Sequence, residues 1–310
     1  MRAMVFAAGL GTRLGPLTDA LPKPVVPVVN RPLCAYGLDT LVDAGATHVV
    51  LNTHHLAGRV EAALASYDRA PLAFAHEARL LGTGGGVKNA VAVQSRALGR
   101  ELAEDDVFVA FNGDISFAPD LEGAIALHRR SGAMATMVVR EVPDAARFGA
   151  IEVDDEGRVR RMLGSPDGSL RACMFTGVHV LSARAIAALP EEGCIVRQGY
   201  VRWLAAGETI SASVDAAPWR DLGTPREYLG AHLDLLRGEI VRPGFDARAA
   251  AIDRSAGIDP KARLSETCVG ARARIEAGVV LERCVVWPET IVRASACDAV
   301  LAGEEIVDAR

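Results

Sequence analysis

The sequence predicts an α/β protein whose mainly parallel sheet carries helices on both faces, followed by a small domain of short strands. Three observations support this prediction. Continuous apolar runs alternate with segments of helical spacing up to about residue 130, as expected for parallel strands covered by helices on both sides. Strand-like runs then follow one another without an intervening helix, and apolar residues near the end of the chain recur every six positions.

The first 130 residues contain both kinds of element in turn. Each predicted strand is a short continuous apolar run, which is typical of a strand that is buried on both faces. The predicted strands are residues 4–8, 48–52, 72–75 and 107–111, and the predicted helices are residues 33–44, 56–67 and 85–97. Because strands and helices alternate, a parallel sheet is expected.

After residue 130 the pattern predicts a mixed sheet that completes a pocket over the first half. Strands are expected at residues 135–139 and 149–153, and residues 154–157 have the composition of a hairpin turn that leads into a strand at residues 158–162. The last clear helix is expected at residues 228–237. We therefore predict one domain over residues 1–237 and a connector over residues 238–257, which is rich in turn and small residues.

Residues 258–310 have a six-residue apolar repeat with one slip in register, between Leu281 and Val285. The repeating positions are Ile258 and Leu264, then Val269, Ile275 and Leu281, and then Val285, Ile291 and Cys297. Short strands of this period, separated by small residues, predict the coils of a left-handed parallel β-helix. The alternative is an irregular β tail. A tail of this kind has apolar edges that need covering, so homo-oligomerisation through it is expected.

Composition limits the class of partner. The 310 residues are 50% hydrophobic and 24% charged, and the net charge is −5, which argues against nucleic acid as the main partner. No run approaches the roughly 20 apolar residues of a membrane span, and no signal peptide is expected because glycines interrupt the first apolar run. The expected location is the cytoplasm. The cysteines are expected to be reduced structural thiols without C-x-x-C pairs. They are Cys34, Cys173, Cys194, Cys268, Cys284 and Cys297.

The strongest chemical signal follows the first predicted strand: FAAGLGTRLGPLT over residues 6–18, then LPKPVVPV over residues 21–28. Gly9 and Gly11 let the backbone approach a phosphate closely and direct N–H groups toward it. Arg13 adds a guanidinium that suits a pyrophosphate, and Lys23 is held between two prolines. The string is neither a Walker A motif nor a dinucleotide-binding fingerprint, because Leu14 stands where the latter requires its third glycine.

The two segments resemble the signature of the sugar-nucleotide pyrophosphorylases, a family that joins a sugar 1-phosphate to a nucleoside triphosphate (NTP) and releases pyrophosphate. The resemblance covers roughly residues 1–232 and implies a Rossmann-like fold. Residues 81–86, LGTGGG, resemble the family's nucleobase loop, and residues 175–177, FTG, resemble a sugar-contacting turn. Residues 112–114, NGD, and 219–225, WRDLGTP, resemble the segments that supply two metal carboxylates.

The resemblance assigns roles to individual residues. The implied nucleotide contacts are Ala8, Gly9, Gly11, Thr12, Glu77, Gly82, Thr83 and Gly113, and the implied sugar-phosphate contacts are Gly149, Thr176 and Gly177. Asp114 and Asp221 would bind Mg²⁺, which prefers oxygen ligands.

The reaction explains why cations are needed. The sugar phosphate attacks the α-phosphorus directly, so no side-chain nucleophile is required, and positioning and charge neutralisation dominate. Arg13 would hold the β- and γ-phosphates and Lys23 the α-phosphate.

Each assignment has a structural alternative. Asp114 could cap a following helix, Asp221 could be a surface ion-pair partner, and Lys23 could be a solvated loop cation. Glu77 suits either a base or ribose contact or a framing residue, and the pair His54-His55 is expected to be structural.

The middle of the chain departs from the family pattern. Many members carry Glu-Lys-Pro where residues 162–166 read MLGSP, so the cation that holds the sugar phosphate is missing or replaced. The candidate replacements are Arg140, Arg147, Arg197 and Arg202. Three glycines at 84–86 are similar to N-acetylmuramate-1-phosphate uridylyltransferases, whereas the tail is similar to mannose-1-phosphate guanylyltransferases.

The expected substrates are GTP with mannose 1-phosphate or a related hexose or heptose phosphate. The alternatives are uridylyl or thymidylyl transfer to a hexose or N-acetylmuramate 1-phosphate, transfer to a non-sugar phosphate, and a non-catalytic paralogue that senses nucleotide sugars.

Overall fold

The computed structural model describes residues 1–9, 11–242 and 244–310, and Leu10 of the signature string lies outside the described residues. The chain forms two compact units. The first consists of Met1–Gly9, Cys34–Gly113 and Phe117–Trp219, and the second of Leu10–Leu33, Asp114–Ser116 and Arg220–Arg310. The signature string is thus shared between the units. The division at residues 237 and 257 that the sequence suggested stays a prediction.

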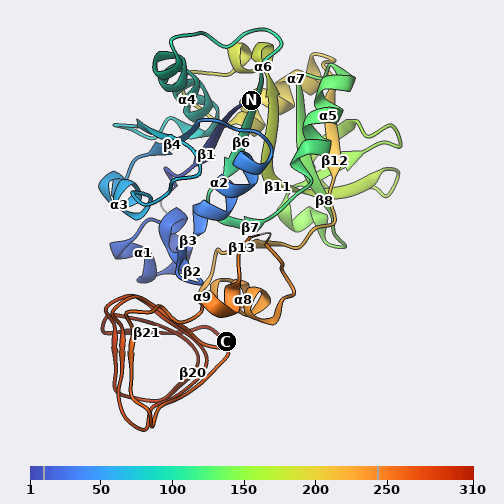
Figure 1. Cartoon of the computed structure of the whole chain (residues 1–310). Helices are drawn as coiled ribbons and strands as arrows, with labels where there is room; N and C mark the ends of the chain where they lie inside the picture. Colours follow the sequence, from blue (N-terminus) through green and yellow to red (C-terminus); the bar gives the residue numbers. More distant parts are fainter. Residues whose placement is uncertain (10, 243) are drawn as a thin grey trace. The chain divides into compact units, whose positions relative to one another are not determined.

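The first unit is built on a nine-stranded sheet with the order β10-β9-β11-β6-β1-β4-β5, in which β8 pairs with both β11 and β12 (Figure 1). Strands β6, β1, β4 and β5 are parallel, whereas β11 is antiparallel to β6, β8 and β9. The strands are β1 (Arg2–Phe6), β4 (Val49–Thr53), β5 (Leu72–His76), β6 (Val107–Asn112), β8 (Ala135–Glu141), β9 (Ala150–Val153), β10 (Val159–Gly164), β11 (Arg171–Ser182) and β12 (Ile210–Val214). The predicted mixed, parallel-rich sheet is confirmed.

Helices lie on both faces of this sheet. In β6, Ala110 belongs to one apolar cluster with Val87 and Ala90 of α4. A methyl group at Gly37 of α2 would lie 2.8 Å from the ring of Phe111, the next residue of β6. Successive strand residues point to opposite faces, so α4 and α2 cover different sides. The helical elements of this unit are α2 (Leu33–Asp43), α3 (Ala57–Ala63), α4 (Gly82–Leu98), α5 (Leu121–Ser131), η3 (Ala145–Phe148), α6 (Ala183–Ala188), η4 (Ile195–Tyr200) and α7 (Val201–Ala205).

The second unit combines part of the N-terminal signature with the end of the chain. Its short elements are η1 (Thr12–Leu14), α1 (Leu17–Ala20), η2 (Lys23–Val25), β2 (Pro27–Val28), β3 (Arg31–Pro32), α8 (Pro225–Arg237) and α9 (Ala247–Ala250). It also holds two of the three residues of each of β7 (Ile115–Phe117) and β13 (Trp219–Asp221). Strands β2 and β3 pair antiparallel, and β7 pairs with β13. α8 has a broad buried face that contacts β2 as well as strands of the C-terminal coil.

The C-terminal coil has a three-sided outline, drawn in orange to red in Figure 1. Its strands stack in parallel, and Gly257 pairs with Arg274, which in turn pairs with Ile291, each seventeen residues further on. Its strands are β14 (Gly257–Ile258), β15 (Arg263–Ser265), β16 (Cys268–Val269), β17 (Arg274–Ile275), β18 (Val280–Val286), β19 (Ile291–Val292), β20 (Ala296–Ala302) and β21 (Glu305–Asp308). Non-glycine residues with positive φ recur along it, and they are Glu266, Arg272, Arg283, Glu289 and Asp298.

Part of the predicted inward-facing repeat is wrong. Val269, Ile275, Leu281 and Val285 are buried, but Ile291 is 44% exposed and Cys297 is also exposed. The reason is the register: Val269 pairs with Val286, and Ile275 pairs with Val292. The six-residue step therefore continues from Val286 to Val292, one position later than the sequence suggested.

The thiols and the helices carry two further results. Among the described residues no cysteine is in a disulfide, and burial raises the pKa of the Cys34 and Cys268 thiols to about 12. No helix in the described part of the chain is long and apolar enough to cross a membrane.

Candidate functional site

Four charged side chains of the second unit converge. Nζ of Lys23 lies 2.8 Å from Oδ2 of Asp114 and 2.8 Å from Oδ1 of Asp221. Nη2 of Arg13 lies 3.0 Å from the other oxygen of Asp221. These four are the predicted catalytic and metal-binding residues, and they come from three separate segments of the chain.

Lys23 is the buried centre of this cluster, with only 3% of its surface exposed. It begins the short helix η2 and stands between Pro22 and Pro24, which restrict the backbone on either side. Gly11 has φ of +65°, and a methyl group there would lie 2.6 Å from Cβ of Lys23. A buried ammonium requires paired acceptors, so Lys23 is not a solvated loop cation.

Arg13 lies at the exposed side of the cluster, with its side chain about two-thirds exposed at 66%. Its position depends on Gly223, which follows Asp221 by two residues, because a methyl group at 223 would lie 2.5 Å from Nη1 of Arg13 and 2.9 Å from Oδ2 of Asp221. Thr12 begins η1 immediately before Arg13, and Gly11 precedes it in the left-handed conformation. The guanidinium is paired with Asp221, and its exposed side can meet an anion from solvent.

The two carboxylates fit a hard divalent cation. Asp114 and Asp221 each direct one oxygen at the point that the Lys23 ammonium occupies, and oxygen is the ligand type that Mg²⁺ prefers. No group of three or more His, Cys, Asp or Glu within residues 1–9, 11–242 and 244–310 is arranged to hold a metal. A Mg²⁺ ion there would take its other ligands from water or from substrate phosphates, as this ion commonly does.

The first unit holds most of the predicted nucleotide contacts, whereas Gly11 and Thr12 belong to the second unit. Ala8 and Gly9 follow β1, and the N–H of Gly113 donates to the carbonyl of Phe6 at 3.0 Å. Glu77 is only 2% exposed. Its two carboxylate oxygens accept from Nδ2 of Asn52 at 2.8 Å and from the N–H of Leu81 at 2.9 Å. Both oxygens are engaged inside the protein, which favours the framing alternative for Glu77.

The glycine-rich segment 82–86 is the first turn of α4, which begins three residues earlier than the sequence suggested. Its glycines allow close packing against residues 190–193: a methyl group at Gly82 would lie 2.6 Å from the carbonyl oxygen of Gly193. The N–H of Gly84 donates to this same carbonyl at 2.8 Å. Oγ1 of Thr83 accepts from the N–H of Ile195 at 2.9 Å. Two polar groups of this segment, the N–H of Gly84 and the hydroxyl of Thr83, therefore already have partners within the chain.

The predicted sugar-phosphate residues surround a bulge in β11. Pairing with β8 shifts between Phe175 and Val178, so Thr176 and Gly177 form the irregular part. The hydroxyl of Thr176 donates to the carbonyl of Val138 at 2.7 Å, and its own carbonyl accepts from Nε1 of Trp219 at 2.8 Å. The ring of Phe148, adjacent to Gly149, packs edge-on against Trp219 at 6.2 Å between centroids.

The four arginines that are candidates to replace the missing lysine differ in their exposure and in their hydrogen-bond partners. Arg140 donates through Nη1 to the carbonyl of Ala216 at 2.7 Å and also to that of Ala217, so its guanidinium is engaged. Arg147 is exposed beside Phe148, with its guanidinium carbon 5.7 Å from that ring. Arg197 and Arg202 are exposed on η4 and α7.

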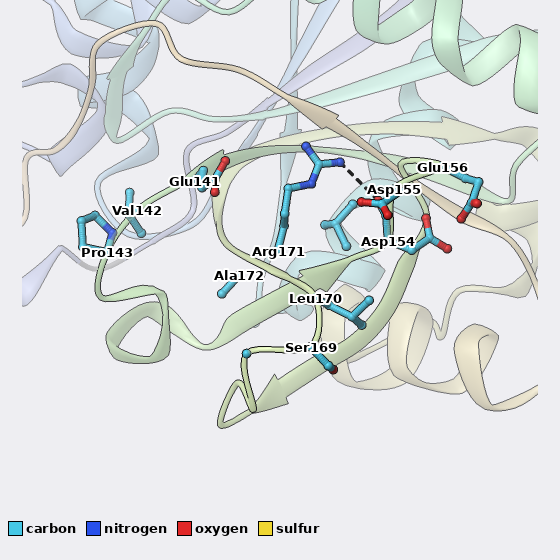
Figure 2. Close-up of a pocket in the computed structure, with 12 residues that line it drawn as sticks. Glu141, Val142, Pro143, Asp154, Asp155, Glu156, Ser169, Leu170, Arg171 and Ala172 are labelled. Atoms are coloured by element: carbon cyan, nitrogen blue, oxygen red, sulfur yellow. Dashed lines mark hydrogen bonds between the residues drawn. The ribbon is translucent and has the colours of Figure 1, made fainter.

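A pocket of about 720 Å³ in the first unit is a poor candidate for this chemistry (Figure 2). Glu141, Asp154, Asp155 and Glu156 line it together with Arg171, whose Nη2 donates to the carbonyl of Asp154 at 3.2 Å. None of the predicted site residues lines it. An acidic wall repels phosphates, so this pocket is not assigned to the substrates.

Three residues of these arrangements were not singled out from the sequence. Asn52 accepts through Oδ1 from the N–H of Ala7 at 2.9 Å and thereby links β4 to the start of the signature string. Its position at the end of a predicted strand was the available signal. Gly223 and Trp219 lie within the WRDLGTP segment, where only the aspartate was assigned a role.

Comparisons with known proteins agree on one family. The sequence model of the protein family described as "Nucleotidyl transferase" matches residues 2–238. The chain is 31% identical over 306 residues to a mannose-1-phosphate guanylyltransferase of Mycobacterium tuberculosis, covering 91% of this chain and 83% of that protein. It is 27% identical over 316 residues to a UTP–glucose-1-phosphate uridylyltransferase of Synechocystis, covering 94% of this chain and 80% of that protein.

The fold is also shared with a solved structure. HddC from Yersinia pseudotuberculosis superposes with a TM-score of 0.59 and 24% identity, covering 74% of this chain and 97% of that chain.

Proposed function

The chain belongs to the nucleotidyl transferase family, and we propose that it joins an NTP to a sugar 1-phosphate, giving an NDP-sugar and pyrophosphate. The observation that carries this proposal is the convergence of Asp114 and Asp221 on Lys23, with Arg13 at the exposed side. Two polyanionic reactants need positive charge and a metal-binding pair of carboxylates in one place. GTP and mannose 1-phosphate are the substrates we favour, since the relative at 31% identity is a mannose-1-phosphate guanylyltransferase.

Each residue of the cluster has a role in this proposal. Arg13 binds the β- and γ-phosphates, because a planar guanidinium matches phosphate oxygens in pairs. Lys23 leaves its carboxylate partners to contact the α-phosphate, where charge develops during transfer. Asp114 and Asp221 would hold Mg²⁺, which would neutralise phosphate charge and help to align the two reactants. The oxygen of the sugar phosphate forms the new bond to the α-phosphorus, and the bond to pyrophosphate breaks.

Uridylyl transfer is the second candidate. It is favoured by the 27% identity to a glucose-1-phosphate uridylyltransferase over 94% of this chain. The segment 82–86 packs against residues 190–193 through backbone groups, so base choice would depend on which backbone groups remain free to meet the base edge.

The proposal extends to the properties that go with this activity. We propose Mg²⁺ as the metal, the cytoplasm as the location, a left-handed sense for the C-terminal coil and homo-oligomers assembled through it. The coil offers exposed apolar side chains for such assembly, among them Val280, Ile291 and Ile306.

A substrate panel tests the function. Thermal shift with each of the four NTPs and Mg²⁺ selects the base, because a ligand that binds the folded state raises the melting temperature. Pyrophosphate release is then measured with that NTP and a panel of hexose, heptose and N-acetylmuramate 1-phosphates, phosphocholine and inositol phosphate. Release with mannose 1-phosphate and GTP is the expected result. Pyrophosphate release only with phosphocholine or inositol phosphate would show that the acceptor is not a sugar phosphate. NTP binding without pyrophosphate release on any acceptor would refute the proposal that the protein is an enzyme.

A further inference from the structure

The C-terminal coil and the segment that carries Lys23 belong to the same compact unit. Helix α8 joins them, because it contacts β2 and also β18, β20 and β21 of the coil. Its start is fixed: Pro225 opens the helix, and the hydroxyl oxygen of Thr224 accepts from the N–H of Glu227 at 3.2 Å. The helix begins four residues after Asp221.

A chain of buried hydrogen bonds runs from the coil to the lysine segment. Nε1 of Trp287 donates to the hydroxyl of Tyr228 at 3.0 Å, and this hydroxyl donates to the carbonyl of Pro27. Trp287 is buried in the coil and Tyr228 is buried in α8. Pro27 opens β2 and lies four residues after Lys23. A hydroxyl has a single hydrogen to donate, so the Tyr228 hydroxyl accepts from Trp287 and donates its hydrogen to Pro27.

A second contact anchors the turn between β2 and β3. Nδ2 of Asn30 lies 2.9 Å, 3.2 Å and 3.0 Å from the carbonyl oxygens of Ala250, Ala251 and Val269. Asn30 has φ of 61° and Val29 has φ of 45°. Valine is rarely found in this conformation, which costs free energy. The contacts of Asn30 with α9 and the coil therefore help to hold a strained turn.

The carboxylate side of the cluster is anchored to the same helix. Arg220, the neighbour of Asp221, donates through Nε to Asp234 of α8 at 2.8 Å and through Nη1 to Glu227 at 2.9 Å. A methyl group at Gly230 would lie 2.7 Å from the Arg220 guanidinium, so this glycine lets the side chain lie flat on α8. The segments that carry Lys23 and Asp221 are thus both anchored to helix α8.

We propose that α8 and the C-terminal coil position the catalytic cluster, and that Trp287, Tyr228 and Asn30 are positioning residues for Lys23. The coil is then a part of the catalytic apparatus rather than an assembly module alone. The kinetic part of this inference rests on the proposed function, whereas its structural part does not.

Trp287→Phe tests the proposal, because it keeps most of the packing and removes the N–H donor. Trp203→Phe is the matched control, since Trp203 is also buried but belongs to α7 of the first unit. Amide hydrogen exchange is followed at Val25, Val26 and Leu33, whose N–H groups donate to backbone carbonyls within residues 22–33, the segment that carries Lys23. We expect exchange to accelerate about fivefold in Trp287→Phe, in keeping with the loss of one hydrogen bond, and to stay unchanged in Trp203→Phe.

Kinetics supply the second readout. We expect kcat of Trp287→Phe to fall about fivefold with little change in KM for the sugar phosphate, because Lys23 acts on the α-phosphate. Asn30→Gly removes the amide but tolerates positive φ, so it should give the same two effects without depending on the tryptophan. Unchanged exchange and kcat in both variants, with only a lower melting temperature, would overturn the proposal. If the wild-type chain turns over no substrate, the exchange experiment still decides the structural part.

Discussion

Gly223 leaves the space that the Arg13 guanidinium occupies: a methyl group at position 223 would lie 2.5 Å from Nη1 of Arg13. Gly223 does not have a positive φ, so alanine suits its backbone. We expect Gly223→Ala to displace Arg13 and to lower kcat/KM for the NTP about tenfold, while the free energy of unfolding changes by less than about 1 kcal/mol.

Steady-state kinetics and urea unfolding measure these two quantities. Gly58→Ala is the control, because a methyl group there would meet no atom within 4 Å. Wild-type kcat/KM for Gly223→Ala would show that the position of Arg13 beside Asp221 is irrelevant to the reaction.

The two aspartates of the cluster should matter for turnover more than for folding. We expect Asp114→Asn and Asp221→Asn each to lower kcat by a factor of about 100 or more, since each removes one charged ligand of the metal. Lys23 keeps the other carboxylate in either variant, so the fold is retained. Initial rates and circular dichroism measure the two effects, with Asp68→Asn, at an exposed position of the first unit, as control. Near-wild-type turnover of either variant removes that residue from the metal site.

Lys23→Ala should abolish turnover while the protein stays folded. The ammonium now separates two carboxylates, and its removal lets them repel each other or attract a free cation. We therefore also expect tighter binding of Mn²⁺ in the absence of nucleotide, measured by calorimetry. An unfolded product would show that Lys23 serves the fold, and turnover within tenfold of wild type would exclude it from the reaction.

Arg147 and Arg140 should respond differently to substitution by glutamine. Arg147 is exposed beside Phe148, next to the predicted sugar-phosphate residue Gly149, so Arg147→Gln is expected to raise KM for the sugar phosphate about tenfold at constant stability. Arg140 holds the carbonyls of Ala216 and Ala217, and Arg140→Gln should lower the melting temperature by a few degrees. The reverse pattern would assign the phosphate to Arg140.

We expect three buried histidines to lower the free energy of unfolding in mild acid. Burial lowers the pKa of His128 to about 4, of His179 to about 3 and of His232 to about 4. Their unfolded pKa is 6.5, so below that pH the unfolded state binds more protons than the folded state. The free energy of unfolding therefore declines between pH 6.5 and about 4, by up to about 1.4 kcal/mol per pH unit for each histidine.

Urea unfolding at pH 7.5, 6.0 and 5.0 measures this decline. His128→Gln, which keeps a polar side chain near Thr136, should reduce the slope. An equal slope in the variant would mean that His128 does not contribute.

The sequence predicted the first half of the sheet well because each strand there is a short apolar run with a clear end. The cluster was predicted through the resemblance, since Asp114 and Asp221 are 107 positions apart and only the fold brings them to Lys23. The strand β11 (Arg171–Ser182) was missed because its bulge at Thr176 and Gly177 interrupts the alternation of inward and outward residues.

Local sequence pattern does not predict the packing of the glycine-rich segment or the register of the C-terminal coil. The resemblance predicts a loop at residues 82–86, but these residues begin α4, and the small size of their glycines allows contact with residues 190–193, which are distant in sequence. The error at Ile291 and Cys297 arose because Val285 and Val286 are both apolar and buried, so composition alone does not say which of them continues the repeat. The division into two units also depends on contacts that no local pattern contains.

The seventeen-residue step between Gly257, Arg274 and Ile291 has a consequence for length variation in this tail. A single inserted residue within a strand turns every later side chain of that strand to the other side of its sheet, which exchanges interior for exterior. Viable length changes are therefore whole coils, each adding or removing about 4.8 Å of stack. We therefore expect natural or engineered changes in the length of this tail to come in multiples of one complete coil.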